Sequence, residues 1–203
     1  MYIGVDIGGS KILVVGGNSK YEILRHEKIK TPETSAQGVT EIIHLIERVV
    51  GDDDIKSIYV ASPGPIDREH GRILKTTNMT WEPVAIVSKL KNHFKVPVGL
   101  EKDANAAALS EAIIGAAKGQ VNVLYVTVST GVGTGVIIDG EIYHGAHDPE
   151  GGHMLIHAEN KNEELEKATS GKAIKRRFGL FGYEIKDANT WDQFAYDLAV
   201  GFH

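Results

Sequence analysis

The amino-acid sequence predicts an α/β protein with a mixed sheet. Residues 2–7, 11–16 and 22–31 read as three consecutive strands, the first two joined by a tight turn at residues 8–10. Apolar residues then recur at helical spacing from residue 39 to residue 50, and this predicted helix ends at Gly51. A strand at 55–61, a helix at 81–94 and a strand at 96–100 continue the alternation that predicts this class.

The alanine-rich run at residues 104–117 predicts a further helix that closes near Gly119. Asp103 stands directly before this run and is its natural N-cap, which would be a purely structural role. The helix dipole and the free N–H groups of a first turn also keep a carboxylate ionised at such a position. Asp103 is therefore a candidate for a cap or for a general base.

Two glycine-rich corners join predicted strands. The stretch VLYVTVSTGVGTGVIID at residues 123–139 places Gly131, Gly133 and Gly135 between two apolar runs, and Gly8 and Gly9 follow the first strand. Glycines permit a positive φ and let backbone N–H groups approach an anion closely, which is how phosphate nests form. No Gly-Lys-Ser/Thr follows the second corner, and no helix is expected there, so neither a Walker loop nor a dinucleotide fingerprint is present. The corners are either phosphate nests or plain hairpin turns.

The composition argues against several classes of protein. The length of 203 residues suits one large domain or two small ones, and a formal net charge of −5 argues against a nucleic-acid surface. Without cysteine the chain has no disulfide framework, thiolate metal site or thiol nucleophile. No apolar run approaches the roughly 18 residues that a membrane span needs. We therefore expect a soluble, cytoplasmic protein.

Several stretches, taken in order, resemble the ROK family of sugar kinases and related repressors. They are VDIGGSK at 5–11, ASPGPID at 61–67, TTNMTW at 76–81, VPVGLEKDANAAALSEAIIGAAKG at 96–119, STGVGTGVIIDGEIYHGAHDPEGGHMLI at 129–156 and LEKATSGKAI at 165–174. The resemblance implies the actin-like ATPase (ribonuclease H-like) fold, with two α/β domains around a cleft. Residues 1–117 would form the N-terminal domain with the first phosphate turn and the catalytic aspartate. Residues 118–203 would begin an incomplete C-terminal domain with the second phosphate hairpin and the sugar-contact loop.

The resemblance also implies roles for individual residues. Asp103 would accept the proton of the attacking sugar hydroxyl, a task for which an ordinary carboxylate suffices in a largely dissociative transfer. The implied sugar contacts are Asn78, Lys102, Glu150, His153 and Glu166, and the implied phosphate contacts are Asp6, Gly8, Gly9, Ser10, Lys11, Thr130, Gly131 and Gly133. Taken singly, Glu150 also fits an exposed loop, Glu166 a surface helix and His153 the start of a strand. The implied cofactors are ATP and Mg²⁺, with the metal arriving on the nucleotide and Asp6 as its candidate protein contact.

Two departures from the family pattern concern the sugar site. Lys102 stands where the family has asparagine; it would either turn inward and pair with Asp103, favouring a different or anionic sugar, or turn to solvent. The cysteine-rich loop that binds zinc in many members is deleted, and the remaining His147, His153, His157 and Glu159 fit no tetrahedral pattern. We therefore expect no structural zinc, a sugar-contact loop held only by packing, and a His153 ring that is free to rotate.

The third departure is length, because family members are usually longer. Residues 189–203 read as a helix with an apolar stripe and no C-cap, so we expect the chain to stop within an element. The missing part would supply the adenosine-facing segment and a last helix. The chain would be a trimmed piece of a longer product, or the remainder would come from another chain.

Together these features predict a glucokinase-like sugar kinase that transfers the γ-phosphoryl group of ATP to a hydroxyl of a hexose or an N-acylhexosamine, as a homodimer in its full-length form. The sugar, and ATP or polyphosphate as donor, stay open. The alternatives are a non-catalytic sugar-sensing member of the family and a fragment that folds with a partner. A repressor is disfavoured because the first strand starts at once, with no helix-turn-helix before it.

Overall fold

The computed structural model describes residues 1–76, 79–146, 148–158 and 161–202. The chain forms two compact units, Met1–Ala106 and Ala107–His203. We call them unit 1 and unit 2. Helix α3 (Asp103–Ile113) carries the chain from one unit into the other. The functional division expected between residues 117 and 118 stays a prediction.

Unit 1 is built on a five-stranded sheet with the strand order β3-β2-β1-β4-β7. The strands are β1 (Tyr2–Ile7), β2 (Lys11–Gly17), β3 (Ile23–Lys30), β4 (Ser57–Ser62) and β7 (Val98–Lys102). The first three form an antiparallel meander, whereas β4 runs parallel to β1 and β7 runs parallel to β4. The predicted mixed sheet is therefore confirmed.

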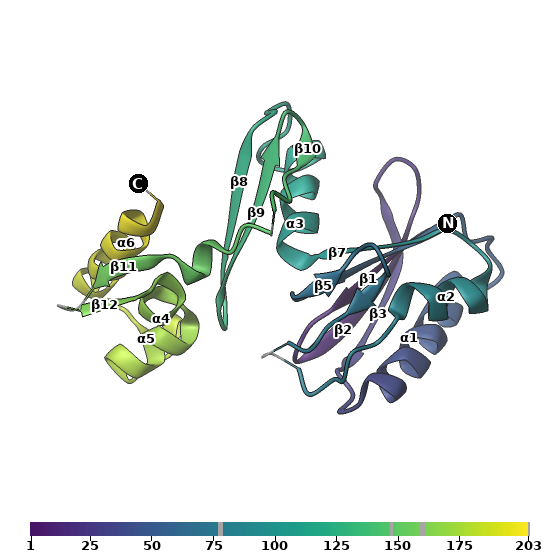
Figure 1. Cartoon of the computed structure of the whole chain (residues 1–203), viewed down its shortest axis with the longest axis horizontal. Helices are drawn as coiled ribbons and strands as arrows, with labels where there is room; N and C mark the ends of the chain where they lie inside the picture. The colour runs from purple at the N-terminus through teal and green to yellow at the C-terminus, as the bar shows by residue number, and fades with distance from the viewer. Residues whose placement is uncertain (77–78, 147, 159–160, 203) are drawn as a thin grey trace. The chain divides into compact units, whose positions relative to one another are not determined.

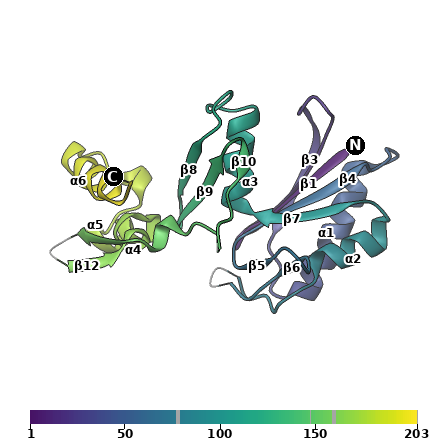
Figure 2. The same cartoon turned by 45° about the horizontal axis from the view of Figure 1, so that its top comes forward.

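Helices α1 (Ser35–Val50) and α2 (Ile86–Phe94) lie on one face of this sheet (Figures 1 and 2). The predicted apolar spacing of α1 places Ile42, Leu45 and Ile46 in the core, where all three are fully buried. Thr34 caps the helix by accepting a hydrogen bond from the Gln37 N–H, and the helix ends at Gly51 with a φ of 58°. Local pattern and capping residues thus agree with the observed element.

Helix α2 begins five residues later than the sequence predicted. Trp81, expected as the first residue of this helix, is 1% exposed and donates from Nε1 to the Pro32 carbonyl oxygen over 2.8 Å. Its ring lies so close to Gly38 that a Cβ there would overlap it. Val84 forms a bridge with Ile73, next to the small hairpin β5 (Ile66–Asp67) and β6 (Arg72–Ile73). Tertiary contacts therefore keep residues 81–85 outside the helix.

Unit 2 contains a three-stranded sheet with the order β10-β9-β8 and a two-stranded sheet of β11 and β12. The strands are β8 (Val123–Val128), β9 (Val132–Ile138), β10 (Glu141–Ile142), β11 (Leu155–Ala158) and β12 (Lys161–Glu164). The helices are α4 (Leu165–Thr169), α5 (Gly171–Phe178) and α6 (Ala188–Phe202), with short 3₁₀ turns η1 (Gly151–His153) and η2 (Gly182–Glu184). Leu165 and Ala168 of α4 form a core with Val132, against which Leu198 and Phe202 of α6 pack.

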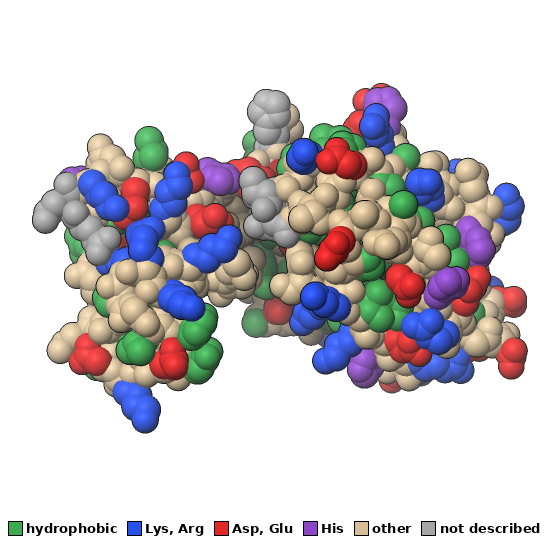
Figure 3. Space-filling model, turned by 90° about the horizontal axis from the view of Figure 1, so that it is seen from below, with side chains coloured by type: hydrophobic (Ala, Val, Ile, Leu, Met, Phe, Trp, Pro, Cys, Tyr) green, Lys and Arg blue, Asp and Glu red, His purple; other side chains and the backbone are tan. Residues whose placement is uncertain are grey.

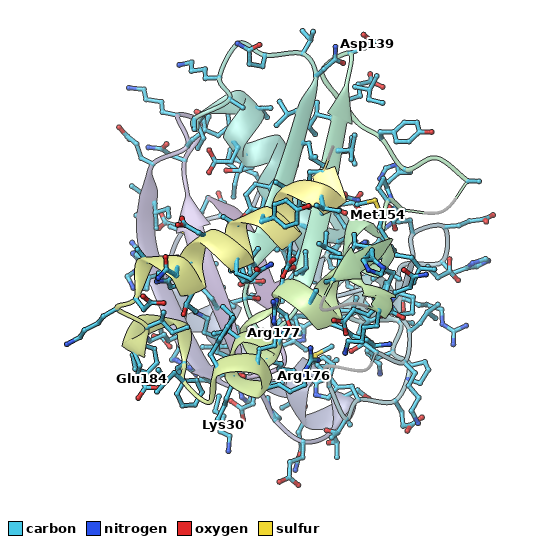
Figure 4. All side chains as sticks on the ribbon, turned by 90° about the vertical axis from the view of Figure 1, so that its left-hand side faces the viewer. Lys30, Asp139, Met154, Arg176, Arg177 and Glu184 are labelled. Atoms are coloured by element: carbon cyan, nitrogen blue, oxygen red, sulfur yellow. The ribbon has the colours of Figure 1, made fainter. Side chains whose placement is uncertain are left out.

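Helix α5 is fastened to both of its neighbours by arginines. Arg176 and Arg177 donate to the carbonyl oxygens of Lys167 and Ala168 over 2.7 Å, which satisfies the C-terminal end of α4. Arg177 points towards α6 (Figure 4) and forms an ion pair of 2.8 Å with Asp197, and both side chains are almost completely buried. Helix α4 therefore belongs to a tightly connected three-helix group.

Lys and Arg side chains are interspersed with Asp and Glu on the face seen in Figure 3. Among the described helices, none combines the length and the apolar character that crossing a membrane would require.

Candidate functional site

The carboxyl ends of three parallel strands in unit 1 lie side by side. Asp6 of β1 pairs with Ala61 of β4, and Ser62 pairs with Lys102 of β7, so Asp6 and Asp103 are brought to the same edge. Such an edge is where open α/β sheets bind ligands. Partial burial raises the pKa of the Asp6 carboxyl although the residue remains exposed; the Asp103 carboxylate raises it further, and the Lys11 ammonium opposes both. The Asp6 and Asp103 carboxylates therefore interact electrostatically.

The predicted first phosphate turn joins β1 to β2. The Gly8 N–H donates to the Lys11 carbonyl oxygen over 2.9 Å, which closes the turn around Gly9 and Ser10. Thr31, which sequence analysis missed, holds the turn from the end of β3: its Oγ1 donates to the Gly8 carbonyl over 2.6 Å and its N–H donates to the Ser10 carbonyl over 3.2 Å. The turn is thus pinned on both sides, and its phosphate-binding role stays a prediction.

Asp103 is the first residue of α3 and its side chain is exposed. Its Oδ1 accepts a hydrogen bond of 2.7 Å from the Ala104 N–H, so the carboxylate sits at the helix N-terminus as expected. The helix ends at Ile113, four residues earlier than predicted. Lys102 is 5% exposed, which favours the inward-turned alternative over the solvent-exposed one.

A buried carboxylate that sequence analysis missed fixes the residues around Asp103. Glu101 Oε1 accepts from the Lys102 N–H over 2.8 Å and from Asn105 Nδ2 over 3.0 Å. Arg68, which follows β5, forms an ion pair with the same carboxylate, with Nε 3.0 Å from both oxygens. Glu101 therefore bridges the residues on either side of Asp103. The available signal was a carboxylate at the end of an otherwise apolar strand, which needs a cationic partner when buried.

The second corner, in unit 2, is a hairpin. β8 and β9 pair antiparallel, and Val128 stands opposite Val132, so residues 129–131 form the tip. The Ser129 N–H donates to the Gly131 carbonyl oxygen over 2.8 Å across this tip. We call residues 129–132 the phosphate hairpin after the role that the sequence predicted for it, and that role stays a prediction.

The glycines of the two corners lack the unusual backbone that was expected, and a close approach is seen at Gly8 and at Gly131. None of Gly8, Gly9, Gly131, Gly133 and Gly135 has a positive φ, so that part of the expectation is wrong. A Cβ at Gly131 would overlap the Glu166 carboxylate.

Glu166, a predicted sugar contact, reaches the phosphate hairpin. Its Oε2 accepts a hydrogen bond of 2.9 Å from the Val132 N–H. The structure thus brings Glu166 together with Gly131 and Val132, an arrangement that sequence analysis did not predict.

The predicted sugar-contact loop, which contains Glu150, is held against β9 of the same sheet by hydrogen bonds. Thr134, which is 2% exposed, donates from Oγ1 to the Pro149 carbonyl and accepts from the Gly151 N–H over 2.9 Å, so it holds the loop on both sides of Glu150. A Cβ at Gly152 would overlap the Val132 carbonyl oxygen. The expectation that packing alone holds this loop is therefore wrong.

His153 has a carboxylate neighbour, contrary to the free ring that was expected. Its Nδ1 lies 3.2 Å from Glu164 Oε2, and its backbone N–H donates to the Glu150 carbonyl. Hydrogen bonds from His153 and from Lys167 lower the pKa of the Glu164 carboxyl. The predicted sugar contact Asn78, and with it His147 and Glu159, lie outside the described residues.

The likeness to solved structures shows the class of protein: the chain has the actin-like ATPase fold, and the ROK hexokinase from Thermus thermophilus matches 99% of this chain and 76% of its own length with a TM-score of 0.81 and 28% identity. The ROK family model matches residues 2–195, and the chain belongs to the ROK family. A fructokinase from Zymomonas mobilis is 32% identical over 93% of this chain and 68% of its own length, and the xylose repressor of Bacillus subtilis is 32% identical over 76% of this chain and 41% of its own. The crystal structure of a ROK family glucokinase from Streptomyces griseus with glucose and AMPPNP has a TM-score of 0.76 and 30% identity, covering 86% of this chain and 59% of that protein.

Proposed function

We propose that this chain is the sugar- and phosphate-binding part of a glucokinase-like sugar kinase, which transfers the γ-phosphoryl group of ATP to a hydroxyl of a hexose or an N-acylhexosamine. One observation carries the proposal: Thr134 of β9 holds the backbone on both sides of Glu150, and β9 also forms the phosphate hairpin contacted by Glu166. Glu150, a group suited to a sugar hydroxyl, is thus held by the strand that also carries the proposed phosphate contacts. Family membership and the kinase names of the relatives support the same reaction.

Asp103 is the group we assign to the attacking hydroxyl. Phosphoryl transfer needs positioning more than strong proton removal, so an exposed carboxylate fixed at a helix N-terminus is suitable. It would orient the hydroxyl and take its proton late in the transfer. The Glu101 bridge supports this role because it fixes the backbone on both sides of Asp103.

The backbone N–H groups of the turn at Gly8–Lys11 and of the phosphate hairpin are the proposed phosphate contacts. Asp6 fits a Mg²⁺ that accompanies the nucleotide, because its exposed carboxylate oxygens are hard ligands. The metal would neutralise charge on the phosphates. We place the protein in the cytoplasm, where ATP and sugar are available.

A second function, sugar sensing without phosphoryl transfer, is favoured by two observations. Lys102 stands directly before Asp103, where the family has asparagine. The xylose repressor has the same 32% identity to this chain as the fructokinase, although over 76% rather than 93% of the chain. A sensor would bind sugar with no turnover of ATP.

The test is phosphorylation of a panel of glucose, mannose, fructose and N-acetylmannosamine by the full-length form of the protein with ATP and Mg²⁺. We expect turnover of at least one sugar, and a kcat lower by on the order of a thousandfold in Asp103→Asn with sugar affinity retained. Equal turnover in Asp103→Asn would contradict the base assignment. Sugar binding without any turnover in the wild type would favour the sensor.

A further inference from the structure

The Glu166 side chain holds the phosphate hairpin at the residue that follows its tip. Glu166 Oε2 accepts the Val132 N–H over 2.9 Å and lies against Gly131. Within the described part of the chain, its other oxygen, Oε1, accepts no hydrogen bond, and the side chain is only half-buried. One carboxylate therefore has one oxygen on the hairpin and one oxygen accessible to a ligand.

Helix α5, which follows the helix that carries Glu166, holds the first residue of the tip. The Gly171 N–H, at the start of α5, donates to the Ser129 carbonyl over 2.7 Å, and a Cβ at Gly171 would lie 2.7 Å from that oxygen. Leu165 is fully buried, and Arg177 ties α4 and α6 to α5. The two ends of the tip are thus fixed by one rigid helix group.

We propose that Glu166 is a positioning residue for the phosphate hairpin and that it links the sugar site to the phosphate site through a single side chain. Oε2 fixes the Val132 N–H and, with it, the direction of the Thr130 and Gly131 N–H groups, while Oε1 accepts from a sugar hydroxyl. An ionised acceptor makes a stronger hydrogen bond than a neutral one, so the tie is firm in the absence of ligand. The identities of the two ligands rest on the proposed function; the tie itself does not.

The tie is tested by amide hydrogen exchange of the ligand-free chain. In Glu166→Ala, the Val132 amide should exchange at least about tenfold faster than in the wild type, because a charge-assisted hydrogen bond is lost. Glu166→Gln should lie between the two, since its amide oxygen can still accept. Glu141→Gln, an equal charge change at an exposed position of β10 in the same sheet, should leave this exchange within about twofold of the wild type. Unchanged protection of Val132 in Glu166→Ala would overturn the proposal.

The functional part is tested by calorimetry of the full-length form of the protein with AMPPNP in the absence of sugar. Glu166→Ala should weaken binding by about fivefold or more, and Glu166→Gln should restore most of it. A residue that only contacts sugar would leave this affinity unchanged, which would overturn the positioning role alone. Failure of the wild type to bind AMPPNP would instead contradict the proposed function, and the exchange measurement would still decide whether Glu166 holds the hairpin.

Discussion

Replacing Arg68 by methionine should destabilise unit 1 through Glu101. The Glu101 side chain is 3% exposed and the Arg68 side chain is 28% exposed, so the variant would remove a guanidinium from a carboxylate that is out of water. Breaking a fully buried ion pair costs about 3–5 kcal/mol, and the partial exposure of Arg68 reduces this to about 2 kcal/mol. Arg72→Met changes an exposed arginine of the same small hairpin and should cost less than about 0.5 kcal/mol.

Tryptophan fluorescence can measure this loss in unit 1 alone. The chain has two tryptophans, and Trp191→Phe leaves only Trp81, which is 1% exposed in the core of unit 1. Urea unfolding in this background gives the free energy of unfolding of unit 1 in Arg68→Met, in Glu101→Gln and in the double variant. We expect the sum of the two losses in unfolding free energy from the single variants to exceed the loss in the double variant by about 1.5 kcal/mol, because both single variants break the same ion pair. Additive losses, within about 0.5 kcal/mol, would refute the reasoning.

Three further predictions concern charge, the first turn and metal. Asp6→Asn should stabilise unit 1 increasingly as pH rises above about 3.8. The raised pKa of the Asp6 carboxyl means that the folded state binds more protons there than the unfolded state, so the contribution of Asp6 to wild-type stability falls as pH rises. Parallel curves of unfolding free energy against pH for the two proteins would contradict this. Gly9→Val should weaken AMPPNP binding while the far-UV dichroism stays unchanged, and an unaltered affinity would leave a plain turn at that corner. Elemental analysis should find less than about a tenth of an equivalent of zinc, because a structural zinc site needs about four closed ligands and the chain has no cysteine; stoichiometric zinc would contradict this.

Elements that depend on local pattern were predictable, and those that depend on distant partners were not. The spacing of α1 and the turn at residues 8–10 depend on neighbouring residues, so the meander was predicted nearly to its ends and α1 to its C-terminal end. Helix α1 begins at Ser35, four residues before the first apolar residue of the predicted pattern. The start of α2 depends on Trp81 reaching Pro32, a residue 49 positions away, which overrides the helical periodicity of residues 81–85.

The same limit applies to the candidate site. The glycine corners and Asp103 were found because each has a short local signature. The contacts that hold them were missed: Glu166 meets Val132 across 34 positions, and Arg68 meets Glu101 across 33. Polar pairs of this kind leave no periodic trace in a sequence.

Gly131 illustrates how the structure changes the interpretation of a glycine and of the experiment that tests it. The sequence suggested that Gly131 admits a phosphate, yet its φ is not positive and the atom nearest to an added Cβ belongs to Glu166. Gly131→Ala would therefore weaken nucleotide binding for either of two reasons, a displaced Glu166 or a blocked phosphate. The double variant with Glu166→Ala separates them, because removing the carboxylate opens the space for the new methyl group. If Gly131 serves Glu166, Gly131→Ala should change AMPPNP affinity by less than about twofold in the Glu166→Ala background, although it weakens binding by about fivefold in the wild type. An equal loss in both backgrounds would mean that the methyl group collides with the phosphate itself, and Gly131 would then be a direct phosphate contact.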